Sequence, residues 1–174
     1  MKKRTEYLLV DGYNVIFSWE NLKKLAEASL EDARIKLLDM LCDYQGFKQN
    51  HVIAVFDAHM IKGGSGSVDK YNNIQVVFTR EAETADNFIE RAAAALAKHD
   101  KVRVVTSDYL EQIIIIGHGA SRVSANDFLH EVNTLKAETQ TRYLSSSIVK
   151  ANPLIDRLDD ETAAILEKMR RNIE

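Results

Sequence analysis

Four short apolar segments are the feature of this sequence that most restricts its fold. They are rich in Val, Ile and Phe, and they are mostly continuous rather than alternating with polar residues: Tyr7–Val10, Val52–Phe56, Gln75–Phe78 and Val102–Val105. Continuous apolar strands are typical of a parallel sheet that is covered by helices on both faces. The intervals between them are long enough for helices, so the sequence predicts an open, mainly parallel α/β sheet.

Helical periodicity fills the intervals between these segments. Apolar residues recur at helical spacing over residues 22–45, with a break expected near Ser29, and again over residues 84–98. A further helix is expected after Ser124, which stands three residues before Asp127, as an N-cap residue does. This alternation of strands and helices supports the α/β class.

Two segments are less regular. Residues 112–117 contain four consecutive isoleucines, which favour a strand, whereas Asp108 and Glu111 before them have the spacing of a capping box, which favours a helix. We expect a short buried helix there, followed by a brief strand near Ser121–Val123. Residues 58–73 include three glycines and show no helical pattern, so they are expected to form a long mobile or binding loop.

The length of 174 residues is most simply that of one domain. The single proline, Pro153, marks a linker to a charged final helix at about residues 157–172. We therefore expect one domain over residues 1–150 and, over residues 151–174, a C-terminal helix that packs on this domain or extends from it.

Charge and composition exclude several classes of protein. A net charge of −3 argues against a protein held on nucleic acid by its overall field, yet a nuclease needs only a local basic rim. No apolar run approaches the roughly 18 residues that span a bilayer, and the apolar stretch after the basic N-terminus is too short for a signal peptide. The single cysteine cannot form an internal disulfide. A cytoplasmic protein without a membrane segment is expected.

Acidic residues gather at the ends of the predicted strands. Asp11, Asp57 and Asp108 follow three of them, and Glu83 and Asp86 follow the remaining one at the start of the helix over residues 84–98. Ligands of open α/β sheets bind at the carboxyl ends of the strands, so these carboxylates are expected at one edge. Glu83 and Asp86 are three residues apart, which predicts that they share one side of a helical turn.

Such a cluster is unfavourable unless something neutralises it. Two carboxylates about 4 Å apart repel by roughly 4 kcal/mol at an effective dielectric constant near 20. Arginines, protonation or a divalent cation would relieve this repulsion, and hard oxygen ligands with open positions suit Mg²⁺ or Mn²⁺. Alternatively, each acid only caps the next helix or turn, which is the simpler reading for any one of them, Asp108 in particular. Because four strand ends carry an acid, we favour a metal site.

Five sequence blocks resemble the YacP-like NYN domains, bacterial relatives of the PIN nuclease fold. The blocks are "VDGYN" (10–14), "VFDAH" (55–59), "FTREAETAD" (78–86), "VVTSD" (104–108) and "SRVSANDF" (121–128). The resemblance covers residues 5–140 and departs from the family at Ile113, where an aromatic residue is expected. It implies a PIN-like open sheet and a magnesium-dependent endoribonuclease. One characterised member associates with ribosomes and cuts messenger RNA during translation, so messenger RNA and the ribosome are the expected partners.

The resemblance assigns candidate site residues one by one. Asp11, Asp86 and Asp108 match the family's acids and are predicted to bind the metal and to be catalytic. Asn14 is expected to steady a ligand or a water molecule through its amide. Asp57 and Glu83 are further candidates, either as direct ligands or as residues that hold metal-bound water.

The expected reaction is metal-assisted hydrolysis of a phosphodiester, which leaves 5′-phosphate and 3′-hydroxyl ends. Thr106 and Ser107 could orient Asp108 by hydrogen bonds. The sequence shows neither a Ser/His or Cys/His constellation nor the paired histidines of a metal-independent ribonuclease. This route needs no nucleophile from the protein.

RNA binding is expected to depend on a few side chains near the acids. The candidates are Lys62, Lys70, Arg80, Arg91, Arg122 and Tyr13. An exposed Tyr13 could stack on a base, whereas Arg91 could instead pair with the carboxylates.

Two rival functions stay open. One is an RNA-binding or ribosome-binding module whose acids are structural. The other is a small-molecule phosphohydrolase, although Tyr13 stands where enzymes with an aspartyl nucleophile usually carry a second acid.

Overall fold

The computed structural model describes residues 4–60, 66–107 and 119–149. The chain divides into two compact units, Met1–Leu135 and Lys136–Glu174. The helix expected over residues 157–172 lies outside the described residues, and the domain limit expected at residue 150 stays a prediction. No helix in the described part of the chain is long and apolar enough to cross a membrane.

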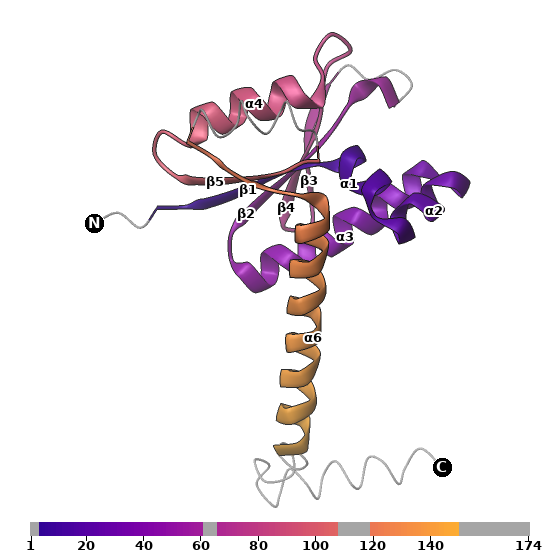
Figure 1. Cartoon of the computed structure of the whole chain (residues 1–174), viewed down its shortest axis with the longest axis vertical. Coiled ribbons are helices and arrows are strands. Elements are labelled where there is room, and N and C mark those ends of the chain that lie inside the picture. Colours follow the sequence, from indigo (N-terminus) through magenta and orange to yellow (C-terminus); the bar gives the residue numbers. More distant parts are fainter. Residues whose placement is uncertain (1–3, 61–65, 108–118, 150–174) are drawn as a thin grey trace, which may run out of the picture. The chain divides into compact units, whose positions relative to one another are not determined.

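The described residues of the first unit contain a six-stranded sheet with the strand order β3-β4-β2-β1-β5-β6 (Figure 1). In chain order the strands are β1 (Glu6–Asp11), β2 (His51–Phe56), β3 (Ser67–Tyr71), β4 (Ile74–Phe78), β5 (Lys101–Val105) and β6 (Ser121–Val123). The four predicted apolar strands and the brief strand at Ser121–Val123 are therefore confirmed.

The pairing of the strands makes β1 the point where the strand order reverses. β1 pairs in parallel with β2 and β5, β4 with β2, and β6 with β5, whereas β3 runs antiparallel to β4 at one edge. From β1 the chain builds the sheet outwards through β2 and β4, and it then returns to the other side of β1 to form β5 and β6. The strand order reverses at β1, and its carboxyl end is where ligands bind in such sheets.

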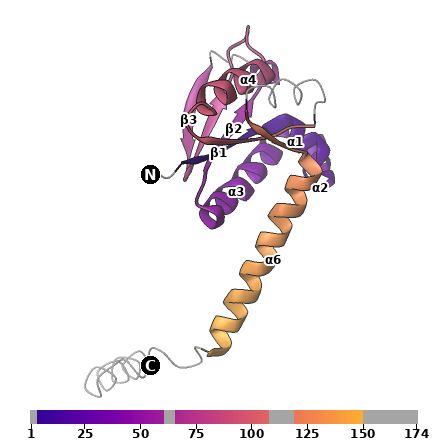
Figure 2. The ribbon, with the colours of Figure 1, turned by 60° about the vertical axis from the view of Figure 1, so that its left-hand side comes forward.

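Helices cover both faces of this sheet (Figures 1 and 2). One face packs against α1 (Gly12–Ser18), α2 (Glu20–Ala28), α3 (Leu30–Lys48) and the part of α6 (Ala125–Val149) up to Leu135, and the other face packs against α4 (Ala85–Leu96). Leu8 and Val10 of β1 join the first core, while Leu9 between them joins the second. A strand buried on both faces reads as a continuous apolar run, which explains the sequence pattern.

The helix boundaries follow from their capping residues. Ser29 Oγ accepts the backbone N–H of Asp32 at 3.1 Å, so the break predicted near Ser29 separates α2 from α3. Ser124 Oγ likewise accepts the backbone N–H of Asp127 at 3.1 Å, and α6 begins where it was predicted. The short helix α1 was not predicted, because it has only seven residues and begins at Gly12.

Residues 58–73 differ from the predicted loop. They contain a 3₁₀ turn at Ala58–Met60 and strand β3, and the turn to β4 passes through Asn72 with a positive φ of 51°. β3 is exposed along nearly its whole length, so it is held by its backbone pairing with β4 rather than by buried side chains. Such an edge strand leaves no hydrophobic periodicity in the sequence. Residues 112–117, including Ile113, lie outside the described residues.

Candidate active site

Asp11 is both the last residue of β1 and the N-cap of α1. Its Oδ1 accepts the backbone N–H of Asn14 at 3.1 Å, and only 8% of the residue is exposed. Gly12 permits the close turn from strand to helix, because a Cβ at this position would lie 2.2 Å from the Phe56 ring. The interpretation of Asp11 as a helix cap is therefore confirmed, but the cap uses only one of the two carboxylate oxygens.

Asp86, in the first turn of α4, reaches Asp11 from the other face of the sheet. The pKa of Asp11 is raised to about 6, mainly because the carboxyl group is buried. The charges of Asp86 and Asp57 and a side-chain hydrogen bond to Asp86 act in the same direction, and the hydrogen bond from the Asn14 N–H opposes them. Two carboxyl groups in hydrogen-bond contact must share a proton or be bridged by a cation. This pair is the part of the predicted acid cluster that the structure brings into contact.

Asp57 lies beyond β2 and is held by other partners. Its Oδ1 is hydrogen-bonded to the backbone N–H of His59 at 2.9 Å and to Nδ1 of that side chain at 2.7 Å, and Oδ2 accepts the N–H of Ala85 at 3.4 Å. Burial alone would raise the pKa of Asp57, but these hydrogen bonds outweigh it and the pKa is lowered. Asp57 thus ties β2 to the beginning of α4, and its role as a metal ligand stays a prediction. The contact with His59 was not predicted, although an Asp side chain often accepts the backbone N–H two residues later in a turn.

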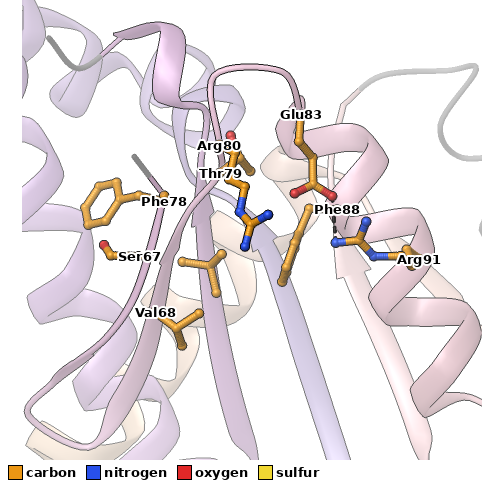
Figure 3. A pocket seen from close by; sticks show the side chains of 10 residues that line it. Ser67, Val68, Phe78, Thr79, Arg80, Glu83, Phe88 and Arg91 are labelled. Atoms are coloured by element: carbon orange, nitrogen blue, oxygen red, sulfur yellow. Dashed lines mark ion pairs between the residues drawn. The ribbon is translucent and has the colours of Figure 1, made fainter. Parts of the chain in front are cut away.

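Glu83 does not share a helical turn with Asp86, contrary to the prediction. Helix α4 begins at Ala85 with Thr84 as its N-cap, so Glu83 precedes the helix. Its carboxylate forms an ion pair with Arg91 at 2.6 Å (Figure 3). The alternative role considered for Arg91, pairing with a carboxylate, is thereby confirmed, and Glu83 has a partner other than a metal.

Asn14 holds the segment that follows β5. Its Oδ1 accepts the backbone N–H of Ser107 at 2.9 Å, while the backbone N–H of the buried Thr106 donates to the carbonyl of Val123 at 3.2 Å. Asn14 therefore holds the segment leading to Asp108, whereas the sequence had suggested that its amide steadies a ligand or a water molecule. Asp108 lies outside the described residues, so its predicted part in the site stays a prediction.

The basic candidates separate by their place in the sheet. Arg80 is exposed just beyond the carboxyl end of β4, and Arg122 is exposed on β6, whose carboxyl end lies beside that of β5. The expectation that Lys70 lies near the acids was wrong. Lys70 pairs with Gln75 near the beginning of β4, because β3 runs antiparallel to it. Lys62 lies outside the described residues.

Tyr13 is buried, so the prediction of an exposed stacking ring was wrong. Only 7% of it is exposed, and its ring packs edge-on against Phe56 at a centroid distance of 5.1 Å. Its hydroxyl accepts a hydrogen bond from Arg34 Nη1 at 3.2 Å. Helix α1 causes this difference, because it turns the residue two positions after Asp11 into the core.

The donor set of the acid pair fits a divalent cation. Within residues 4–60, 66–107 and 119–149, no group of three or more His, Cys, Asp or Glu side chains is arranged to hold a metal ion. Mg²⁺, however, is commonly bound by only one or two carboxylates together with water and substrate phosphate oxygens. Asp11 and Asp86 supply two such carboxyl groups, and their mutual repulsion favours a cation between them.

An open α/β sheet with paired acids at the point where its strand order reverses has the architecture of PIN-like nucleases. The model of the YacP-like NYN domain matches residues 8–171, and the chain belongs to this family. Membership supports a nuclease or RNA-related role.

Individual relatives agree with this assignment. The protein YacP from Bacillus subtilis (strain 168) is 41% identical over 167 residues, which are 95% of this chain and 97% of the relative. Two crystal structures of Rae1 (YacP) from Bacillus subtilis are each 40% identical to the chain. A mutant form aligns with a TM-score of 0.73 over 84% of this chain and 87% of that chain, and the other structure with 0.68 over 95% and 94%.

Proposed function

We propose that this protein is an endoribonuclease that hydrolyses RNA phosphodiester bonds with Mg²⁺, or with Mn²⁺ in its place. The observation that carries the proposal is the contact between the buried Asp11 and the exposed Asp86 at the carboxyl end of β1. Membership of the YacP-like NYN family supports it. Messenger RNA as the substrate and the translating ribosome as the place of cleavage rest on the family resemblance and belong to the same proposal.

The side chains of the site have separate tasks in this reaction. Asp11, Asp86 and Asp108 would hold the cation, which when bound neutralises phosphate charge and lowers the pKa of water. Asp11 has to lose its proton to serve as a ligand, so its raised pKa makes the site sensitive to pH near 6. Asn14 fixes the segment that leads to Asp108, and the exposed Arg80 would attract a phosphate of the substrate.

The test compares RNA cleavage by the purified protein and by two variants, Asp11→Asn and Asp86→Asn. Loss of one ligand is expected to slow cleavage by at least about 100-fold, since even partners outside the ligand set change metal sites by about 10–100-fold. RNA binding should persist or tighten, because the substitution removes a charge that repels phosphate. Asp43→Asn, an exposed acid on α3, is the matched control and should leave the rate unchanged. A chelator should abolish cleavage, and the products should carry 5′-phosphates.

Mapping the new 5′ ends on naked transcripts and on translating ribosomes tests the substrate part of the proposal. Equal rates in the wild-type protein and both variants would contradict the catalytic assignment. Hydrolysis of an aryl phosphate without RNA cleavage would identify a phosphohydrolase, and RNA binding without cleavage by the wild-type protein would identify a binding module.

A further inference from the structure

A pocket of about 430 Å³ lies between the β3–β4 hairpin and α4 (Figure 3). Its volume is within the range of about 300–1,000 Å³ that is typical of small-molecule sites. Val68, Val77 and Phe88 form its apolar walls, and Arg80, Glu83 and Arg91 are its charged residues. The acid pair does not use this pocket, and the residue pattern of the sequence did not reveal it.

The apolar walls present a flat ring opposite an exposed valine. Phe88 is half-buried on α4. Val68 is the one aliphatic residue of β3, and it is 68% exposed. The guanidinium of Arg91 lies 5.6 Å from the centroid of the Phe88 ring. A planar apolar group fits against such surfaces, because aromatic rings and guanidinium planes both stack on nucleic-acid bases.

The charges of the pocket favour an anion. Arg91 is paired with Glu83, but Arg80 forms no ion pair with any described residue. Two arginines and one glutamate leave the lining with a net positive charge. Figure 3 shows the side chain of Arg80 extending into the pocket.

The absence of a side chain at Gly66 leaves space for the Arg80 side chain. It has a positive φ of 78°, and a Cβ there would lie 2.7 Å from Arg80 Cγ. The hairpin thus allows the arginine to lie close to its backbone. An arginine that forms no ion pair with a described residue and lies beside a flat apolar wall provides both elements that a nucleotide requires, a phosphate contact and a surface for the base.

We propose that this pocket binds a nucleotide of the RNA strand that is cleaved, with its base between Val68 and Phe88 and its phosphate at Arg80. The inference rests on the proposed nuclease function and adds a second binding position to it. β4 lies two strands away from β1, which corresponds to about 10 Å at the usual strand spacing. The bound nucleotide is therefore a neighbour of the cleaved bond, and the pocket fixes where along the strand the acids act.

The test measures binding of nucleoside 5′-monophosphates to the full chain carrying Asp11→Asn, which prevents cleavage. NMR signals of the Val68 methyl groups and the Phe88 ring should shift as adenosine or cytidine 5′-monophosphate is added. Inorganic phosphate, which lacks a base, should bind at least about tenfold more weakly, because stacking is absent. Equal binding of phosphate and nucleotide, or shifts that spare Val68 and Phe88, would overturn the proposal.

Two charge-matched variants sharpen the test. Arg80→Gln should weaken nucleotide binding by about tenfold or more, the effect expected for a hydrogen bond to a charged group. Lys70→Gln removes the same charge from the other end of the hairpin and should change affinity by less than about twofold. Both side chains are exposed, so neither substitution removes buried packing. An unchanged affinity in Arg80→Gln would refute the proposed phosphate contact.

The outcome also separates this inference from the proposed function. If the wild-type protein cleaves RNA but no nucleotide binds in the pocket, the inference fails and the nuclease proposal stands. If nucleotides bind there with the stated Arg80 dependence and RNA is not cleaved, the pocket stands and the nuclease proposal fails.

Discussion

Asp11 has two roles that make opposite demands on its charge. As the N-cap of α1 it accepts a backbone N–H, which favours the carboxylate, whereas burial and the neighbouring Asp86 and Asp57 favour the protonated form. The pKa of about 6, against an ordinary value of 3.8, shows that burial and repulsion prevail. The acid pair is therefore a strained feature of the fold as well as the proposed centre of the chemistry.

This conflict predicts a pH-dependent effect of Asp11→Asn on stability. A carboxyl group whose pKa is higher in the folded than in the unfolded state contributes stability that is fully present below about pH 4 and is lost as the pH rises through about 6. A shift of about 2 units corresponds to roughly 3 kcal/mol at most. Asn carries no charge and remains a good N-cap. The variant should thus be more stable than the wild type at pH 8 and nearly equal to it at pH 4.

Urea unfolding at both pH values, with a chelator present, measures this difference. Asp43→Asn serves again as the control, because that exposed acid lies on α3. Equal destabilisation of Asp11→Asn at pH 4 and pH 8 would mean that the charge of Asp11 does not strain the fold. In a separate measurement at pH 8 without the chelator, Mg²⁺ should stabilise the wild type more than the variant.

At the scale of single residues, the sequence predicted that the acids gather at one edge of the sheet but not how each is held. Asp11 and Asp86 were found because strand ends in a parallel sheet share one edge. The prediction that Glu83 and Asp86 share one side of a helical turn was wrong, because α4 begins two residues after Glu83 with Thr84 as its cap. The burial of Tyr13 depends on α1, a helix too short for its periodicity to be recognised.

At the scale of elements, the junction of β1 and α1 is tightly packed around Phe56. Phe56 is fully buried and lies between the rings of Tyr13 and Phe78, at centroid distances of 5.1 and 5.6 Å. It contacts the backbone at Gly12 so closely that no side chain fits there. The glycine of "VDGYN" is thus explained by packing, without any part in the chemistry.

Gly12→Ala is therefore expected to destabilise the protein by about 1–3 kcal/mol, as overpacked cores do. The expected direction is opposite to helix propensity, which favours Ala over Gly by about 1 kcal/mol. Gly46→Ala is the matched control, since Gly46 lies on α3 with nothing within 4 Å of the added Cβ. That variant should be neutral or slightly more stable. Thermal or urea unfolding measures the stability of both variants. If the cause is steric, the double variant Gly12→Ala/Phe56→Leu should recover part of the stability that Gly12→Ala loses.

Prediction from sequence succeeded for the longer buried elements and failed for the short helix α1 and for the exposed strand β3. The parallel strands and helices α2, α3, α4 and α6 leave apolar patterns and capping residues that can be recognised in one sequence. β3 leaves neither, because four of its five residues are exposed and its pairing uses the backbone alone. The pocket beside α4 depends on this hairpin, so it could not be foreseen either.

At the scale of the whole molecule, the net charge of −3 restricts how RNA can be bound. The candidate cations toward the carboxyl edge of the sheet are Arg80, Arg122 and Arg91, and Arg91 is already paired with Glu83. Lys70 lies toward the other end and should not contribute. Binding should therefore depend on a small number of phosphate contacts rather than on a broad basic surface.

This arrangement predicts a weak dependence of RNA affinity on salt. Each phosphate contact to a single strand contributes a slope of about −0.7 to log K against log salt, so three or four contacts give about −2 to −3. Fluorescence anisotropy with a single-stranded RNA and the Asp11→Asn protein, without divalent cations, measures the slope. Arg80→Gln should reduce its magnitude by about 0.7, whereas Lys70→Gln should leave it unchanged. A slope steeper than about −5 would require a basic surface much larger than the described residues provide, and equal effects of both variants would mean that the RNA does not follow the carboxyl edge of the sheet.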